Sequence, residues 1–188
     1  MTTHQTNTAL VVVDVQNDFC PGGALATARG DDVARAIAEL LERDHSYSHV
    51  LATQDWHIDP GAHFSDTPDF VDSWPVHCVA ESEGAQLRSP IDPARIGAYF
   101  RKGEYSAAYS GFEAANEGVL LGDWLRGEGI SAIDVCGIAT DHCVRATVLD
   151  ALREGFAVRV FSHMCSPVDD ARGDAALEEM RAAGAEVL

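Results

Sequence analysis

One cysteine of the sequence follows a pattern that can activate a thiol. Apolar, β-branched residues at 133–136 stop at Gly137, and apolar residues at helical spacing resume directly after Cys143. This pattern is typical of a strand, a short turn and a helix, with Cys143 in the first helical turn. Unpaired N–H groups and the positive end of the helix dipole favour an anion there. We therefore expect the Cys143 thiol to ionise more easily than a free thiol.

The turn before Cys143 could also stabilise a reaction intermediate. Gly137 and Ala139 are small enough to let backbone amides approach a substrate oxygen, so the same turn could supply an oxyanion hole. A cysteine beside an apolar strand is, however, more often a small buried hydrophobe than a nucleophile. The rest of the chain has to decide between these two interpretations.

Two charged residues could support a nucleophilic cysteine. Asp14 follows an apolar run at 9–13, and Lys102 is the single lysine beside twelve arginines. A partly buried carboxyl has a raised pKa and can accept a thiol proton, and an ammonium group can stabilise both a carboxylate and a thiolate. Taken singly, each would more often be a solvated surface group.

Imidazole and carboxylate side chains gather in one polar stretch and could bind a metal ion. Asp55 and His57 stand two residues apart, which puts them on the same side of an extended segment, and His63 and His77 could return from the following loop. A single loop histidine is usually just solvated. Together, mixed carboxylate and imidazole ligands favour one divalent ion, Zn, Mn or Fe(II), over Ca or Mg.

Aromatic residues from the same regions could wall a pocket for a flat ligand. Each of them alone is more often a core residue, so the prediction rests on their shared neighbourhood. The four residues are Phe19, Trp74, Tyr105 and Tyr109.

Strand and helix patterns alternate along the chain and predict the fold class. The fold is expected to be a three-layer α/β/α arrangement with a six-stranded, mainly parallel sheet and right-handed crossovers, a Rossmann-like topology. Strands are predicted at 9–13, 48–53, 97–101, 131–136, 156–161 and 185–188. Helices are predicted at 31–41, 116–127, 140–153 and 171–183, with Gly184 as the stop of the last.

The predicted topology brings the chemical groups together. Ligands of such folds bind beyond the carboxyl ends of the strands. Asp14, Asp55, Lys102 and Cys143 each follow the end of a different predicted strand, so they should converge on one rim of the sheet. The long irregular stretch at about 54–94 is then expected to be a metal- and substrate-binding loop within a single domain at 1–188.

Composition narrows the function classes. The net charge of −17 argues against sequence-independent nucleic-acid binding, and no apolar run reaches membrane-spanning length. Residues 1–8 show no secretory signal, and the five cysteines are odd in number and widely spaced, which together favour reduced thiols and a cytoplasmic location. The composition leaves open whether the protein is a monomer or a homo-oligomer. We assign structural roles to Cys20, Cys78, Cys136 and Cys165.

Six segments together resemble the nicotinamidases of the isochorismatase-like family of cysteine hydrolases, and the resemblance covers nearly the whole chain. The Asp, Lys and Cys positions mark the wider family, whereas the Asp-x-His, His and Trp-Pro-x-His pieces are specific to nicotinamidases. The segments are VDVQNDFC at 13–20, TQDWH at 53–57, GAHF at 61–64, SWPVHC at 73–78, RKG at 101–103 and GIATDHC at 137–143.

The resemblance implies an amidohydrolase that acts on a linear amide. It implies that Cys143 attacks the amide carbon, Asp14 shuttles the proton and Lys102 supports both, so that nicotinamide gives ammonia and nicotinic acid through a thioester, a step of NAD salvage. Pyrazinamide should also be a substrate. The resemblance further implies an oxyanion hole at the amides of Ala139 and Cys143, after a cis peptide between Ile138 and Ala139.

The resemblance also implies what the metal does. In nicotinamidases an ion bound at the positions of Asp55, His57 and His77, with His63 a ligand in some members, accepts the pyridine nitrogen directly or through water. Phe19 and Trp74 match residues that stack on the ring, and Tyr105 and Tyr109 lie nearby.

The sequence is compatible with three other interpretations of its function. The chain could be a family relative that hydrolyses a carbamoyl or ureido substrate or isochorismate, although such relatives generally lack the metal ligands. It could be a hydrolase in which metal-bound water attacks and Cys143 is only core. It could also be a non-catalytic binding protein on the same fold.

Overall fold

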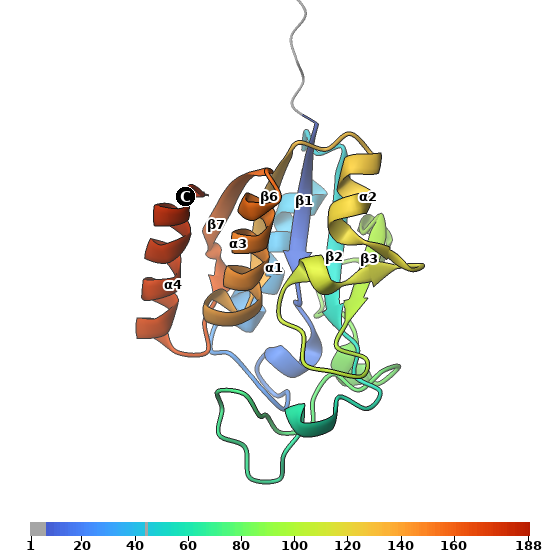
Figure 1. Ribbon diagram of the computed structural model, residues 1–188, viewed down its shortest axis with the longest axis vertical. Helices are drawn as coiled ribbons and strands as arrows, with labels where there is room; N and C mark the ends of the chain where they lie inside the picture. Colours follow the sequence, from blue (N-terminus) through green and yellow to red (C-terminus); the bar gives the residue numbers. More distant parts are fainter. Residues whose placement is uncertain (1–6, 44) are drawn as a thin grey trace, which may run out of the picture.

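The computed structural model describes residues 7–43 and 45–188. Within these residues a single sheet of eight strands has the order β5-β4-β3-β2-β1-β6-β7-β8 (Figure 1). The strands are β1 (Thr8–Val13), β2 (His49–Asp55), β3 (Ala98–Lys102), β4 (Ala115–Asn116), β5 (Val119–Leu120), β6 (Ala132–Ile138), β7 (Ala157–Ser166) and β8 (Glu186–Val187).

Parallel pairing joins six of the strands, from β3 through β2, β1, β6 and β7 to β8. This confirms the mainly parallel sheet. The expected count of six was too low, because β4 and β5 add a short antiparallel hairpin at the β3 edge. Glu117 and Gly118 between them have φ of 49° and 84°, so a two-residue turn lies where the sequence pattern predicted the start of a helix.

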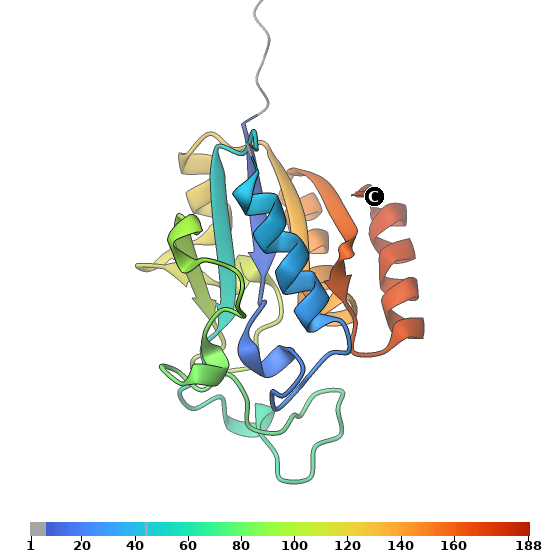
Figure 2. The same cartoon turned by 180° about the vertical axis from the view of Figure 1, so that it is seen from behind.

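Helices cover both faces of the sheet, as the alternating pattern predicts. Helix α1 (Gly30–Glu42) lies on one face, and α2 (Leu121–Gly127), α3 (Arg145–Arg153) and α4 (Asp170–Ala183) lie on the other (Figures 1 and 2). Gly184 ends α4 in the left-handed region with φ 113°, which confirms the predicted stop. Within the described residues no helix is both long and apolar enough to span a membrane.

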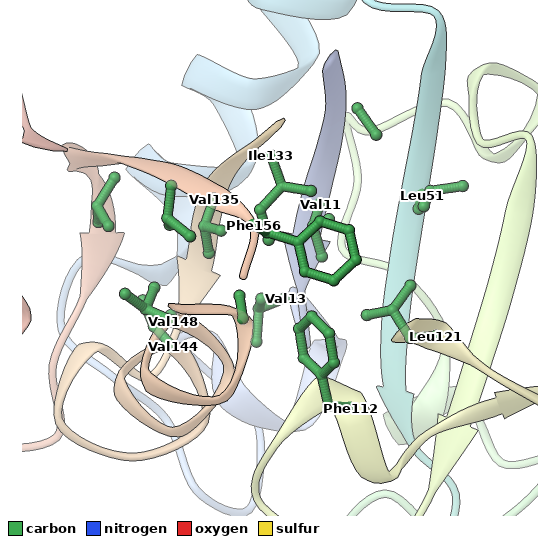
Figure 3. Packing of buried hydrophobic residues seen from close by; sticks show 14 of the residues in the cluster. Val11, Val13, Leu51, Phe112, Leu121, Ile133, Val135, Val144, Val148 and Phe156 are labelled. Atoms are coloured by element: carbon green, nitrogen blue, oxygen red, sulfur yellow. The ribbon is translucent and has the colours of Figure 1, made fainter. Parts of the chain in front are cut away.

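The core explains why β1 is the central strand. Its side chains alternate between the two faces, so that Val11 and Val13 pack under α2 and α3 while Leu10 and Val12 pack under α1. All four are fully buried. Figure 3 shows the layer under α2 and α3, where Val144 and Val148 of the helical segment meet strand residues such as Val135. Burial on both faces accounts for the unbroken apolar run.

The predicted strand, turn and helix around Cys143 are confirmed, with a local difference. One turn of π-helix (Thr140–Val144) separates β6 from α3, and the peptide between Ile138 and Ala139 is cis. Gly137 has φ 125°, and a Cβ there would lie 2.1 Å from the carbonyl oxygen of Val13. Only glycine therefore lets β6 lie this close to the end of β1.

The long polar stretch is irregular, as its composition predicts. Beyond the end of β2 it holds short 3₁₀ turns and isolated β-bridges rather than helices or longer strands. It gathers beyond the carboxyl ends of β1, β2 and β3 (Figures 1 and 2). Gly61–His63, Glu83–Ala85 and Pro93–Arg95 are 3₁₀ turns of this stretch, and Asn17–Phe19 and Gly111–Glu113 are two more outside it.

Candidate active site

Asp14 is the first residue beyond β1, and its side chain is completely buried. Its φ of 45° turns the chain away from the sheet. The Thr53 hydroxyl donates a hydrogen bond of 2.6 Å to Asp14 Oδ1, and Lys102 Nζ lies 2.9 Å from Asp14 Oδ2. Asp14 is thus a carboxylate held in place by a neighbour on β2 and a cation at the end of β3.

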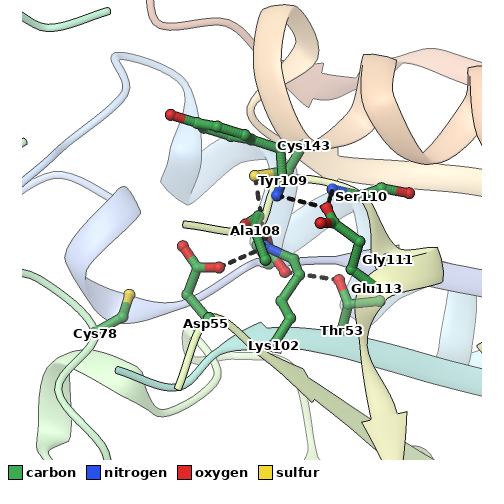
Figure 4. A network of polar contacts seen from close by, with 12 residues as sticks. Thr53, Asp55, Cys78, Lys102, Ala108, Tyr109, Ser110, Gly111, Glu113 and Cys143 are labelled. Atoms are coloured by element: carbon green, nitrogen blue, oxygen red, sulfur yellow. Dashed lines mark hydrogen bonds and ion pairs between the residues drawn. The ribbon is translucent and has the colours of Figure 1, made fainter. Parts of the chain in front are cut away.

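Lys102 is the hub of the site (Figure 4). Its ammonium lies 2.5 Å from Asp55 Oδ1, 3.2 Å from the carbonyl oxygen of Ala108 and 3.7 Å from Cys143 Sγ, besides its bond to Asp14. The predicted convergence of the four strand-end residues on one rim is therefore confirmed. A buried cation lies between two carboxylates and a thiol.

Burial sets the protonation states of these groups. Burial raises the pKa of Asp14 above its usual value, although Lys102 partly offsets the effect. Burial would also raise the pKa of Asp55, but the ammonium of Lys102 holds it well below its usual value. For Lys102 the two carboxylates outweigh burial and raise the pKa further. Asp55 and Lys102 therefore carry their charges at neutral pH.

The expectation of an easily ionised Cys143 thiol is wrong for the protein without substrate. Desolvation raises the pKa of Cys143 well above that of a free thiol, and the nearby Lys102 only partly counteracts it. The sequence pattern indicated the helix terminus and a cation, but it could not show that Cys143 as a whole is only 7% exposed. The thiol therefore keeps its proton until a base removes it, and Asp14, with its raised pKa, is suited to that task.

Three buried histidines form a compact cluster beside Lys102. Ring nitrogens of His57, His63 and His77 all lie within 4.8 Å of one another. His57 Nδ1 is 2.6 Å from the carbonyl oxygen of Gly103, and His77 Nδ1 is 2.7 Å from that of Pro75. A carbonyl oxygen only accepts, so both Nδ1 atoms carry the proton and both Nε2 atoms present a lone pair.

These residues fit a divalent metal ion. The Nε2 atoms of His57 and His77 are 3.3 Å apart, the separation of about 3.3 Å expected for two nitrogens in a tetrahedral shell with bonds of about 2.0–2.1 Å. Asp55 Oδ2, the oxygen opposite its Lys102 contact, lies 3.5 Å and 3.7 Å from them. Burial and the two other rings lower the pKa of His63 to about 4, which leaves it neutral and able to bind a metal.

A cavity of about 270 Å³ opens onto both groups of residues. Asp55, His63 and His77 line it together with Cys143 and Ala139. The cavity therefore exposes a thiol and a set of metal ligands to the same bound molecule.

The aromatic residues predicted to wall a pocket separate into two groups. Phe19, Trp74 and Tyr109 line the cavity, and Trp74 Nε1 donates to the Tyr109 hydroxyl at 3.2 Å. Tyr105 does not line it, and the expectation that it contributes to the wall is not met. Its side chain is 68% exposed, because the chain leaves β3 in a bend at 104–106 that faces solvent.

Sequence reasoning missed several residues of the cavity wall, and two of them, His142 and Phe70, carry rings. His142 lines the cavity, with its ring stacked near Tyr109 and edge-on to Trp74 at centroid distances of 6.1 Å and 5.2 Å. Phe70 lies at the wall and is half exposed. Adjacency to Cys143 was the signal for His142, whereas Phe70 has none, since its position depends on a turn in which Asp69 accepts three backbone hydrogen bonds.

Comparison with known proteins agrees with this arrangement. The family model described as the isochorismatase domain matches residues 8–188. A nicotinamidase/pyrazinamidase from Mycobacterium tuberculosis is 52% identical over 181 residues, which cover 96% of this chain and 97% of the relative.

Solved structures give the same result. A protein from L. infantum in complex with nicotinate has a TM-score of 0.87 and 34% identity, over 100% of this chain and 95% of its own. The pyrazinamidase of Pyrococcus horikoshii in complex with zinc has a TM-score of 0.82 and 35% identity, over 97% and 98% of the two chains. Because the family model matches residues 8–188 and a relative with 52% identity covers 96% of the chain, the chain belongs to the isochorismatase family.

Proposed function

We propose that this chain is a nicotinamidase, which hydrolyses nicotinamide to nicotinic acid and ammonia in NAD salvage and accepts pyrazinamide as well. One observation carries the proposal: Cys143 and the ligands Asp55, His63 and His77 line one cavity with flat aromatic walls. The cavity thus has two poles, the Cys143 thiol at one and the proposed metal ligands at the other. A planar ring with a nitrogen on one side and a carboxamide on the other matches them, because the nitrogen can face the ligands while the carboxamide faces the thiol. The high identity to a named nicotinamidase/pyrazinamidase supports the same substrate class.

In the proposed mechanism, Asp14 takes the proton of the Cys143 thiol as the sulfur bonds to the amide carbon. The carbonyl electron pair moves to oxygen, and the backbone amides of Ala139 and Cys143 stabilise that oxyanion. The C–N bond then breaks, Asp14 returns the proton to the leaving nitrogen, and ammonia departs. Water, deprotonated by Asp14, hydrolyses the thioester, releases nicotinic acid and restores the thiol.

Lys102 keeps its proton throughout this cycle. It neutralises the Asp14 and Asp55 carboxylates, and its distance of 3.7 Å from Cys143 Sγ lets it stabilise the thiolate as the proton leaves. Its bond to Asp55 also couples the two poles of the cavity, since Asp55 belongs to the proposed metal ligands.

The residues Asp55, His57, His63 and His77 would hold one divalent ion, Zn, Mn or Fe(II). When bound, the ion supplies a Lewis-acid partner for the ring nitrogen of the substrate, directly or through water, and orients the ring. Phe19, Trp74 and Tyr109 would pack against the two faces of the ring.

Removing the metal is expected to lower ammonia release from nicotinamide about a hundredfold or more, because the substrate loses its orienting partner. The measurement compares metal-replete protein, protein dialysed against a chelator, and dialysed protein resupplied with Zn, Mn or Fe(II). Restoration by added metal supports the proposal. No ammonia from the metal-replete protein would contradict it and would favour a carbamoyl or ureido substrate.

Replacing Trp74 with alanine is expected to raise KM for nicotinamide about 3–10-fold, since a ring-stacking contact worth about 0.5–1.5 kcal/mol is lost. Steady-state kinetics gives KM and kcat for the variant. Tyr105→Ala is the matched control, because that aromatic side chain lies outside the cavity and its loss should leave KM unchanged. An unchanged KM in Trp74→Ala would make Trp74 a core residue only.

We further propose that residues 1–188 act as one catalytic domain, with the stretch at about 54–94 as its metal- and substrate-binding loop, and that the enzyme works in the cytoplasm. Residues 1–6 of this range lie outside the described part of the chain. All five cysteines are free and buried, which suits a reducing compartment.

A further inference from the structure

Where β1 stops, the side-chain amide of Gln16 makes the hydrogen bonds to β2 that a further β1 residue would make. Pairing of β1 with β2 extends to Val13 and Thr53, and Asp14 then turns the chain away. The backbone of Asp55, two residues beyond Thr53, therefore has no β1 residue beside it. Gln16 Oε1 accepts from the Asp55 N–H at 2.9 Å, and Gln16 Nε2 donates to the Asp55 carbonyl oxygen at 2.8 Å.

A third hydrogen bond anchors this amide to the substrate loop. Gln16 Nε2 also donates to the carbonyl oxygen of Ala85 at 2.9 Å, an oxygen that Gln54 Nε2 contacts at 3.1 Å. Gln16 is completely buried, so water cannot replace any of these bonds without a rearrangement. The side chain is thus fixed from two directions and cannot rotate freely.

The backbone of Asp55 determines where its carboxylate can reach, and contacts of the side chain then orient the two oxygens. One carboxylate oxygen lies 2.5 Å from Lys102 Nζ, and the other faces His57 Nε2 at 3.5 Å and His77 Nε2 at 3.7 Å. A change in φ or ψ at Asp55 would move both oxygens. It would therefore disturb the contact with Lys102 and the metal site at the same time. The N–H and C=O groups of this residue, whose directions follow those two angles, are the groups that Gln16 binds.

We propose that Gln16 is a positioning residue that sets the affinity of the metal site by holding Asp55 in place. The inference rests on the proposed function only for the identity of the metal ligands. Residues that hydrogen-bond to a metal ligand and orient it, without contacting the metal themselves, typically contribute about 10–100-fold to metal affinity.

Two substitutions test this role against a matched control. Gln16→Glu keeps the shape and the acceptor but removes the NH₂ donors, and Gln16→Met removes both donor and acceptor. Asn17→Asp is the control, because Asn17 Nδ2 donates at 2.8 Å to the carbonyl oxygen of Glu83 in the same loop without touching Asp55. All three variants lose a hydrogen bond from a side-chain amide to the loop. Only the Gln16 variants also lose hydrogen bonds to Asp55, one in Gln16→Glu and both in Gln16→Met.

The measurement is the zinc Kd of each protein, from competition with a chromophoric chelator, beside thermal unfolding of the metal-free proteins. Both Gln16 variants are expected to bind zinc about 10–100-fold more weakly than wild type, and Asn17→Asp is expected to bind it like wild type. A Gln16 variant with wild-type zinc affinity would overturn the inference. Equal weakening in Asn17→Asp would also overturn it, since the loop rather than Asp55 would then set the affinity.

A variant that fails to fold without metal is measured in an osmolyte that restores its fold, because the midpoint of zinc-induced refolding combines the zinc affinity with the free energy of unfolding. The result is independent of the substrate. If wild type bound zinc but released no ammonia from nicotinamide, the proposed function would fail while the zinc titrations still decided the role of Gln16.

Discussion

Replacing Cys143 with alanine is expected to lower ammonia release from nicotinamide by about 10⁴-fold or more, because no other group at this position can form the acyl intermediate. The fold should survive, since alanine removes one sulfur from a small buried side chain. The measurement is kcat/KM by continuous ammonia detection, with circular dichroism as the test of folding.

Two companion variants make the result specific. Cys165→Ala removes another buried thiol from the same core cluster and should retain activity. Cys143→Ser keeps the size but supplies a much weaker nucleophile, so it should be nearly inactive. Most of the activity remaining in Cys143→Ser would contradict the proposed mechanism and would favour attack by metal-bound water instead.

Replacing Lys102 with alanine is expected to damage both turnover and stability. Turnover should fall about a hundredfold or more, because the thiolate and both carboxylates lose their cation. The free energy of unfolding should fall by about 3–5 kcal/mol, since Asp14 and Asp55 would be left as neighbouring buried charges without a partner. Urea unfolding of the metal-free protein measures the second effect and steady-state kinetics the first.

A double variant separates the two effects. In Lys102→Ala combined with Asp14→Asn, one of the two uncompensated charges is removed, so part of the stability lost in Lys102→Ala should return while turnover stays low. Wild-type kcat in Lys102→Ala would exclude Lys102 from the mechanism. Unchanged stability would show that the carboxylates find protons or water in its absence.

The convergence of the chemical groups could be predicted because it follows from topology. In a parallel sheet every strand delivers the residue after its carboxyl end to the same rim, so Asp14, Asp55, Lys102 and Cys143 had to meet once the strands were recognised. The helices and most strand centres could be predicted from the periodic spacing of their apolar residues, because that spacing reflects which side of each element is buried. The hairpin at 115–120 could not, because its few residues carry no periodicity and its turn depends on two left-handed residues.

Properties that depend on burial by segments distant in the sequence could not be predicted from the sequence. The pKa of Cys143 was expected to fall. The direction of its shift depends on how completely the loops exclude water, and here the effect of burial is larger than that of the Lys102 charge, so the pKa rises. Tyr105 and Tyr109 look equivalent in the sequence, yet a solvent-facing bend separates the first from the cavity. Gln16 belonged to a recognised segment, but its role appears only when the end of β1 is seen beside Asp55.

The buried position of Lys102 leaves the protein without any accessible side-chain amine. Every other basic residue of the chain apart from histidine is an arginine, and Lys102 is 2% exposed. Acylating reagents, amine cross-linkers and enzymes that modify lysine therefore find no side-chain amine on the folded surface. Any reaction at Lys102 would require the strand ends to separate, so acylation of this one amine would report how often the catalytic rim opens.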